Sequence, residues 1–144
     1  MKKSGKLVTL LLALFMVVVT VLPAMAAPSE INSQKIWLPP NMVWTFGGEV
    51  THNSAYFGAE AKCETVYPES GVDNFNTIRY RITDSYGVVI SEKPYVPITE
   101  GTGYVGVKIK QGYNDLGHIC FQFQGNRKYS ANAIVSYNGS AYVP

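Results

Sequence analysis

The chain has 144 residues, of which 47% are hydrophobic and 12% aromatic, and its formal net charge is +2. This length suits one domain built around one hydrophobic core. Three lysines lie within the first six residues, and without them nine basic residues face ten acidic ones. A net charge of −1 gives no electrostatic reason to expect nucleic acid or an anionic membrane as a partner.

The first 26 residues have the pattern of a secretory signal peptide. A basic start precedes an apolar run over residues 7–22 that ends at Pro23, and Ala24 and Ala26 occupy the −3 and −1 positions of a cleavage site. The run is shorter than the roughly 20 residues of a membrane-spanning helix, which favours cleavage over a retained anchor. We therefore expect residues 1–26 to be removed and the protein to be secreted. The leader resembles bacterial signals more than eukaryotic ones.

The remaining chain is predicted to be one all-β domain. Residues 27–35 are small and polar and predict a flexible lead-in, whereas residues 36–144 are predicted to form a single antiparallel β-sandwich. Turn residues recur about every 8–12 positions, which is typical of sandwiches with seven or eight short strands and Greek-key connections. Apolar and polar residues alternate with a period of two over 59–67, 78–82, 105–109 and 119–123.

Cys63 and Cys120 are the two cysteines of the chain, and in an exported protein an even count predicts a disulfide. The alternative is a pair of unbonded buried thiols. The strand pattern places Cys63 on the same inner face as Tyr67. It places Cys120 on the face opposite Phe121, together with Gln122. A core disulfide would need a bulge near Cys120 or a strand covered on both faces, and otherwise the disulfide would lie near the surface.

The separation of the two cysteines is similar to that of immunoglobulin domains, in which a disulfide joins the two sheets. The stretch 115–120 is similar to the one before the second cysteine of that family, although His118 stands where the family has a tyrosine. The resemblance implies a shared sandwich architecture, and an immunoglobulin-like arrangement is one form the predicted Greek-key sandwich could take.

Residues that could carry catalysis are few. His52 and His118 are the two histidines, and no nucleophile motif accompanies either of them. Glu60 and Glu64 share a strand face but lie about 13 Å apart along it, beyond the spacing of paired glycosidase carboxylates. No spacing of ligand residues indicates a metal or cofactor. We therefore predict that the protein is not an enzyme. The alternative is a small hydrolase that uses one of the histidines.

Aromatic residues are the strongest sign of binding, because tyrosine and tryptophan combine a flat apolar face with a polar tip. Tyr67, Tyr80 and Tyr137 lie in predicted strands and are expected to pack in the core or across strands. Tyrosines in predicted turns are expected to contact a ligand, unless they too are ordinary packing residues. These turn residues are Tyr86, Tyr95, Tyr104, Tyr113 and Tyr129.

The sequence thus predicts a secreted, non-catalytic binding domain without metal or cofactor. Its expected partner is an extracellular polysaccharide or protein, recognised through loops that bear aromatic residues. The alternative is a secreted inhibitor or toxin-like effector that acts on another protein through surface complementarity.

Overall fold

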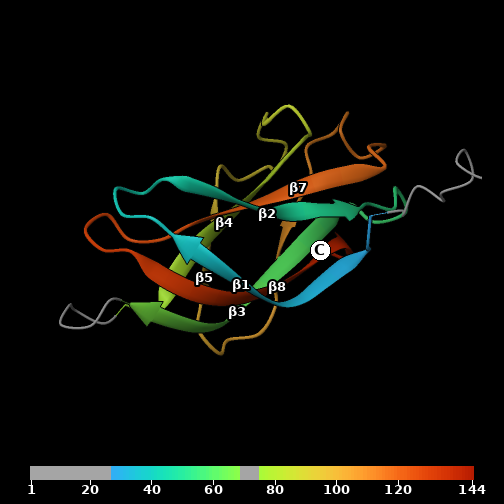
Figure 1. The fold of residues 1–144 in the computed structure, drawn as a ribbon. Helices are drawn as coiled ribbons and strands as arrows, with labels where there is room; N and C mark the ends of the chain where they lie inside the picture. Colours follow the sequence, from blue (N-terminus) through green and yellow to red (C-terminus); the bar gives the residue numbers. More distant parts are fainter. Residues whose placement is uncertain (1–26, 69–74) are drawn as a thin grey trace, which may run out of the picture.

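The computed structural model describes residues 27–68 and 75–144, so the predicted signal peptide lies outside the described residues. The described part contains strands and connecting loops (Figure 1). The eight strands are β1 (Glu30–Leu38), β2 (Trp44–Thr51), β3 (Gly58–Pro68), β4 (Thr77–Thr83), β5 (Val96–Thr99), β6 (Val105–Lys108), β7 (His118–Gln124) and β8 (Ala131–Ala141).

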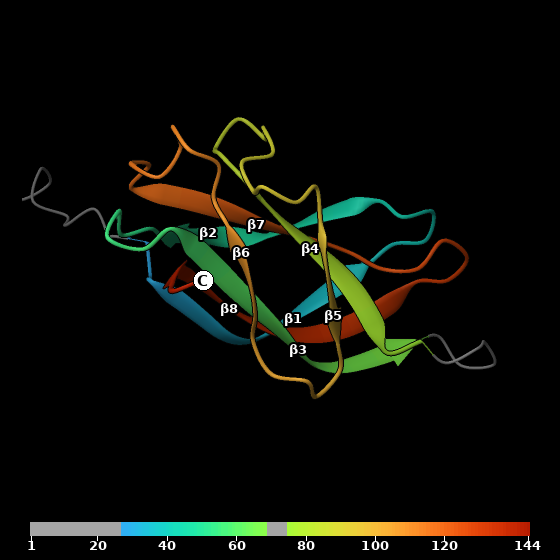
Figure 2. The same ribbon diagram turned by 180° about the vertical axis from the view of Figure 1, so that it is seen from behind.

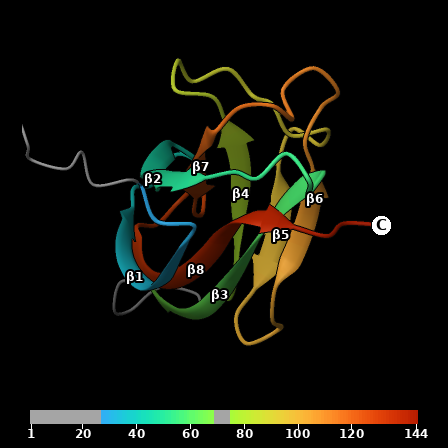
Figure 3. The same ribbon diagram turned by 90° about the vertical axis from the view of Figure 1, so that its right-hand side faces the viewer.

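The strands form two four-stranded antiparallel sheets, in the orders β1-β8-β3-β6 and β2-β7-β4-β5. We call them the first and the second sheet. Figure 2 shows the same ribbon from behind, with β6 and β5 at the edges of the two sheets. In Figure 3 these two edge strands lie side by side, and they are in contact. The prediction of an all-β sandwich with seven or eight strands is confirmed.

The strand order is that of a jelly roll. Strands pair from the outside of the sequence inward, β1 with β8, β2 with β7, β3 with β6 and β4 with β5. This long hairpin is rolled up so that β8 also pairs with β3, and β7 with β4. The arrangement is a double Greek key, and not the immunoglobulin-like form that the sequence left open. A separation of two residues along the chain carries no information on which strands are neighbours.

The core lies between the two sheets and is centred on four aromatic rings. Tyr137 of the first sheet packs against Phe121 of the second at 4.6 Å between ring centroids, and against Phe123 at 5.5 Å. Tyr80 stacks on Phe121 at 5.8 Å. All four side chains are fully buried, so these rings join the sheets through apolar area and aromatic packing.

The two buried tyrosines also satisfy their hydroxyl groups. The Tyr80 hydroxyl donates to the Val105 carbonyl at 2.7 Å, and the Tyr137 hydroxyl donates to Gln34 Oε1 at the same distance. Burial raises the pKa of both phenols well above the ordinary value, because a charged phenolate would lose its hydration. Both hydrogen bonds link different strands and help to hold the edge strands β6 and β1 on the core.

The first strand begins earlier than the sequence predicts. Residues 27–35 were expected to be a flexible lead-in, but Glu30 already pairs with Asn138, and β1 continues to Leu38. The sequence pattern did not indicate this strand, because its residues are mostly polar. Its outer face is solvent-exposed, and on its inner face the Gln34 side chain forms hydrogen bonds with the Gly47 carbonyl and the Tyr137 hydroxyl. A side-chain amide whose hydrogen bonds are satisfied inside the protein can occupy an inward-facing position at which the alternation pattern predicts an apolar residue.

Candidate functional site

The outer, solvent-facing surface of the first sheet is shaped by two β-bulges, one on each side of the central strand β8. The register of β1 on β8 shifts between Ile31 and Gln34, and that of β3 on β8 shifts between Cys63 and Thr65. The first irregularity lies opposite Ser136 of the central strand β8, whereas the second lies opposite Val135 and Ile134 of the same strand. A bulge adds one residue to a strand and therefore reverses which side chains face outward beyond it.

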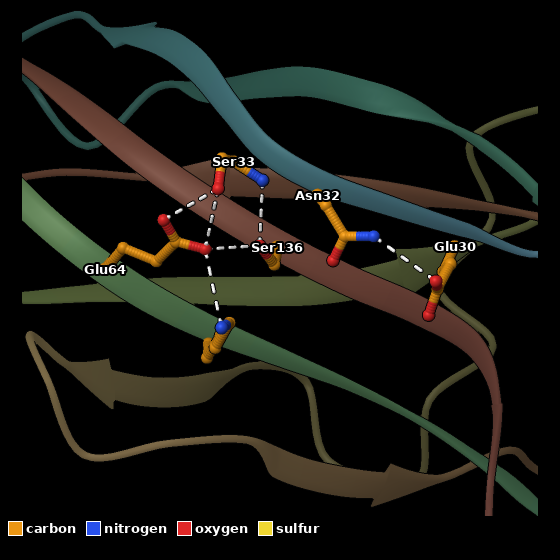
Figure 4. Close-up of polar contacts among 6 residues, drawn as sticks. Glu30, Asn32, Ser33, Glu64 and Ser136 are labelled. Carbon is orange, nitrogen blue, oxygen red and sulfur yellow. Dashed lines mark hydrogen bonds and ion pairs between the residues drawn. The ribbon is translucent and has the colours of Figure 1, made fainter.

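Hydrogen bonds hold the two bulges together, as Figure 4 shows. The buried Ser136 hydroxyl donates to Glu64 Oε1 at 2.6 Å and accepts from the Ser33 backbone N–H at 2.9 Å. The Ser33 hydroxyl donates to Glu64 Oε2 at 2.9 Å. Ser33 has a φ of 49°, a conformation that few residues other than glycine adopt and that these bonds hold in place. We call Ser33, Glu64 and Ser136 the bulge cluster.

The charge of Glu64 is stabilised within this cluster. Hydrogen bonds from Ser136 and then from Ser33 lower the pKa of Glu64, and the Lys62 ammonium 3.5 Å away adds to this effect. The Ser136 hydroxyl already donates to one group and accepts from another, so its proton is committed to the carboxylate. The cluster is thus built to fix backbone geometry, and its hydroxyl groups are not arranged as activated nucleophiles.

Beyond the bulges, two large aromatic side chains point outward on either side of one amide. In the register of the sheet, Trp37 of β1 and Tyr67 of β3 both lie directly opposite Asn132 of β8. Trp37 is 56% exposed and Tyr67 is 53% exposed. With neighbouring strands about 4.8 Å apart, their backbones are roughly 10 Å from each other. We call Trp37, Asn132 and Tyr67 the aromatic platform.

The prediction for Tyr67 was wrong. Tyr67 was expected on the inner face together with Cys63, but the bulge at Glu64 reverses the alternation, so Val66 is buried and Tyr67 is exposed. The other two strand tyrosines, Tyr80 and Tyr137, are buried as predicted. Sequence reasoning also left Trp37 without a role. Its position between the buried Ile36 and Leu38 was the available signal that it faces outward.

The turn tyrosines that were expected to bind a ligand lie in four different connections between strands. Tyr86 is 91% exposed, in the turn after β4. Tyr95 and Tyr104 precede β5 and β6, strands of different sheets. Tyr113 packs against the core cluster, and Tyr129 is partly buried in the connection between β7 and β8. Their role in binding stays a prediction.

The expected disulfide is absent, and both cysteines are free and buried. Cys63 belongs to the core cluster of the first sheet. Cys120 alternates with the core residues Ile119 and Phe121 and therefore lies on the outer face of the second sheet, opposite Glu49. Cys63 faces the core between the sheets and Cys120 faces away from it, so the two thiols do not approach each other and cannot be bridged. Burial, with a smaller contribution from the charge of Glu100, raises the pKa of Cys63 to about 11.

The two histidines lie far from the platform in the topology. His52 is buried, with Nδ1 2.5 Å from the Gly139 carbonyl oxygen and Nε2 3.2 Å from Asn114 Oδ1, so both ring nitrogens have partners. His118 is exposed on the second sheet, 3.5 Å from Glu49. Among residues 27–68 and 75–144, no group of three or more potential ligand residues could hold a metal ion.

Comparisons with known proteins assign no family to this chain. No model of a protein family matches the sequence, and no curated protein matches it. Within the described ranges, the structure contains no helix of the length and apolarity needed to cross a bilayer. The two outer sheet surfaces are therefore compared by their geometry and chemistry.

Proposed function

We propose that this protein is a secreted, non-catalytic domain that binds an extracellular polysaccharide through the aromatic platform. The observation that carries the proposal is the register of Trp37 and Tyr67 on either side of Asn132, with both rings about half exposed. Exposed aromatic groups of this size, held on the two strands that flank β8, are typical of surfaces that contact a partner.

The chemistry of the three side chains suits a sugar chain. Aromatic rings offer flat apolar faces that stack on the apolar faces of sugar rings, and they lose little conformational entropy on binding. The Asn132 amide can both donate and accept hydrogen bonds, which matches hydroxyl groups of a sugar. An extended polysaccharide that lies across β1, β8 and β3 would contact all three residues at once.

The location of the platform on strands also supports binding. Side chains on sheet strands are held more firmly than side chains on loops, so less entropy is lost when a ligand binds. The bulge cluster lies in the same three strands and fixes the register that turns Trp37 and Tyr67 outward. Export follows from the leader pattern, which would bring the domain into contact with polysaccharides outside the cell.

The test is affinity gel electrophoresis and titration calorimetry of residues 27–144 against a panel of soluble polysaccharides. Trp37→Ala and Tyr67→Ala should each weaken binding by about tenfold or more, the usual cost of removing a central aromatic contact. Tyr86→Ala is the matched control, since Tyr86 is 91% exposed but lies in a turn outside the platform. It should bind as the wild type does.

Two results would refute the platform. If Tyr86→Ala weakened binding and Trp37→Ala did not, recognition would reside in the loops. If no polysaccharide bound but a purified extracellular protein did, with the same dependence on Trp37 and Tyr67, the partner would be a protein and the inhibitor or effector function would take the place of glycan binding.

A further inference from the structure

The outer surface of the second sheet, on the opposite side of the molecule, carries arginines that are held against aromatic rings. The Arg79 guanidinium lies 4.4 Å from the centre of the Tyr95 ring, and that of Arg81 lies 4.2 Å from the Trp44 ring. Arg81 Nε also donates to Gln122 Oε1 at 2.8 Å. A guanidinium that is stacked on a ring keeps its N–H edges free for a planar anion and has already lost much of its rotamer freedom.

One end of this surface is hollowed into a cleft of about 540 Å³. Its lining includes Met42, Thr77, Arg79, Tyr95, Asn126 and Arg127. In the part of the chain that the structure describes, no acidic residue lines the cleft and no ion pair to Arg79 or Arg127 is found. The larger hollow beside the C-terminal residues, about 690 Å³, differs because Glu92 and Asp115 line it together with Lys108.

The wall of the cleft is a strained but well-anchored loop. Asn41 and Met42 have φ angles of 66° and 56°, which are uncommon for residues with side chains. The Asn41 N–H donates to the Arg127 carbonyl at 2.8 Å, and the Gln124 side-chain amide donates to the Met42 carbonyl. Strain of this kind persists where the surrounding structure holds it, and it often occurs at ligand sites. These bonds place the backbone of Arg127 at the rim of the cleft.

We propose that this cleft binds the anionic group of an acidic polysaccharide, with Arg79 and Arg127 as the residues that contact the anion. Arginine forms paired hydrogen bonds with both carboxylate and phosphate, so the shared chemistry is a sugar chain that bears one of these groups. The Asn126 side-chain amide supplies a neutral donor for a neighbouring hydroxyl, and Tyr95 acts as a positioning residue for Arg79. The inference does not depend on the aromatic platform, because the two sites lie on different sheets.

Titration calorimetry at low ionic strength tests the proposal with three probes: polygalacturonate for carboxylate, soluble wall teichoic acid for phosphate, and dextran as a neutral control. At least one acidic probe should bind, more weakly as salt rises, and dextran should not compete for this cleft. The better of the two acidic probes identifies the anion. Arg79→Gln and Arg127→Gln should each weaken that binding by about tenfold, the cost of one charge-assisted contact.

Lys128→Gln is the matched control, because it removes the same charge beside Arg127 without altering the lining of the cleft. Its affinity should remain within about twofold of the wild type. Tyr95→Ala should weaken binding and Tyr95→Phe should restore it, since the ring and not the hydroxyl contacts Arg79. Arg127 is exposed in a loop, so Arg127→Gln should fold normally even if Arg79→Gln does not.

Equal losses in Arg127→Gln and Lys128→Gln would indicate general charge attraction and would overturn the site. The absence of binding to both acidic probes would also overturn it. Trp37→Ala should retain the binding of the acidic probe. Loss of that binding in Trp37→Ala would place the anion on the platform and overturn the cleft, so failure of the one site is distinguishable from failure of the other.

Discussion

Replacing Ser136 by alanine removes the central member of the bulge cluster. Its hydroxyl donates to the Glu64 carboxylate at 2.6 Å and accepts from the Ser33 N–H at 2.9 Å. A hydrogen bond to a charged group contributes about 2 kcal/mol when the carboxylate is partly exposed, and the neutral bond contributes about 1 kcal/mol. Ser136→Ala should therefore lower the free energy of unfolding by about 3 kcal/mol.

The loss should depend on pH, which links it to Glu64. In the folded protein the pKa of Glu64 lies below its ordinary value of 4.5, chiefly because of the bond from Ser136. The stabilisation by the ionised carboxylate is complete above pH 4.5 and disappears as the pH falls through the lower folded pKa. Urea unfolding at a series of pH values should show a large difference between the wild type and Ser136→Ala at neutral pH and a smaller one in acid.

Ser140→Ala is the control on the same strand, since that hydroxyl accepts a bond from a neutral group, the Asn53 N–H, at 2.8 Å. Its cost should be about 1 kcal/mol or less and independent of pH across the acid range. A Ser136→Ala protein as stable as the wild type, or a deficit that stays constant below pH 4.5, would refute the account of the cluster as the element that holds both bulges.

Three further results are expected. Alkylation of the protein unfolded without reductant should modify both Cys63 and Cys120, as read by intact mass. The folded protein should react slowly, because both thiols are buried and the pKa of Cys63 is raised to about 11. Two unmodified cysteines linked by a disulfide would contradict the sheet register. Gly48→Ala should lower the free energy of unfolding by about 1–3 kcal/mol, because its new Cβ would overlap the Tyr137 hydroxyl. Thermal unfolding of Gly117→Ala, whose new Cβ has no atom within 4 Å, provides the comparison. Equal melting temperatures of the two variants would show that the core adjusts to the added methyl group. Tyr80→Phe should cost about 1–2 kcal/mol in urea unfolding because the Val105 carbonyl loses its donor, and an unchanged midpoint would mean that water replaces the hydroxyl.

The fold class could be predicted from the sequence because strand alternation is a local property. A buried face leaves its mark on every second residue, as in Ile119, Phe121 and Phe123. The same alternation predicts that Cys120 lies on the face opposite Phe121, and the structure confirms this outward position. The disulfide was predicted from the compartment and the cysteine count alone. Neither of these determines whether the two cysteine side chains face each other.

The candidate site was less accessible to sequence reasoning. Strict alternation along β3 places Tyr67 inward, and the alternation fails because an extra residue, Glu64, is accommodated in that strand. The partners that stabilise this bulge are Ser136, which is 72 residues away, and Ser33, which is 31 residues away. No window of the sequence around Tyr67 contains either of them.

By itself the sequence determined the leader pattern, the all-β class and the approximate strands, because each of these depends on residues that are close together along the chain. Only the tertiary structure decided the jelly-roll order, the free cysteines and the outward direction of Trp37 and Tyr67. The physical reason is that strand order and bulge position depend on hydrogen bonds between strands, and those bonds form between residues that the sequence separates by dozens of positions.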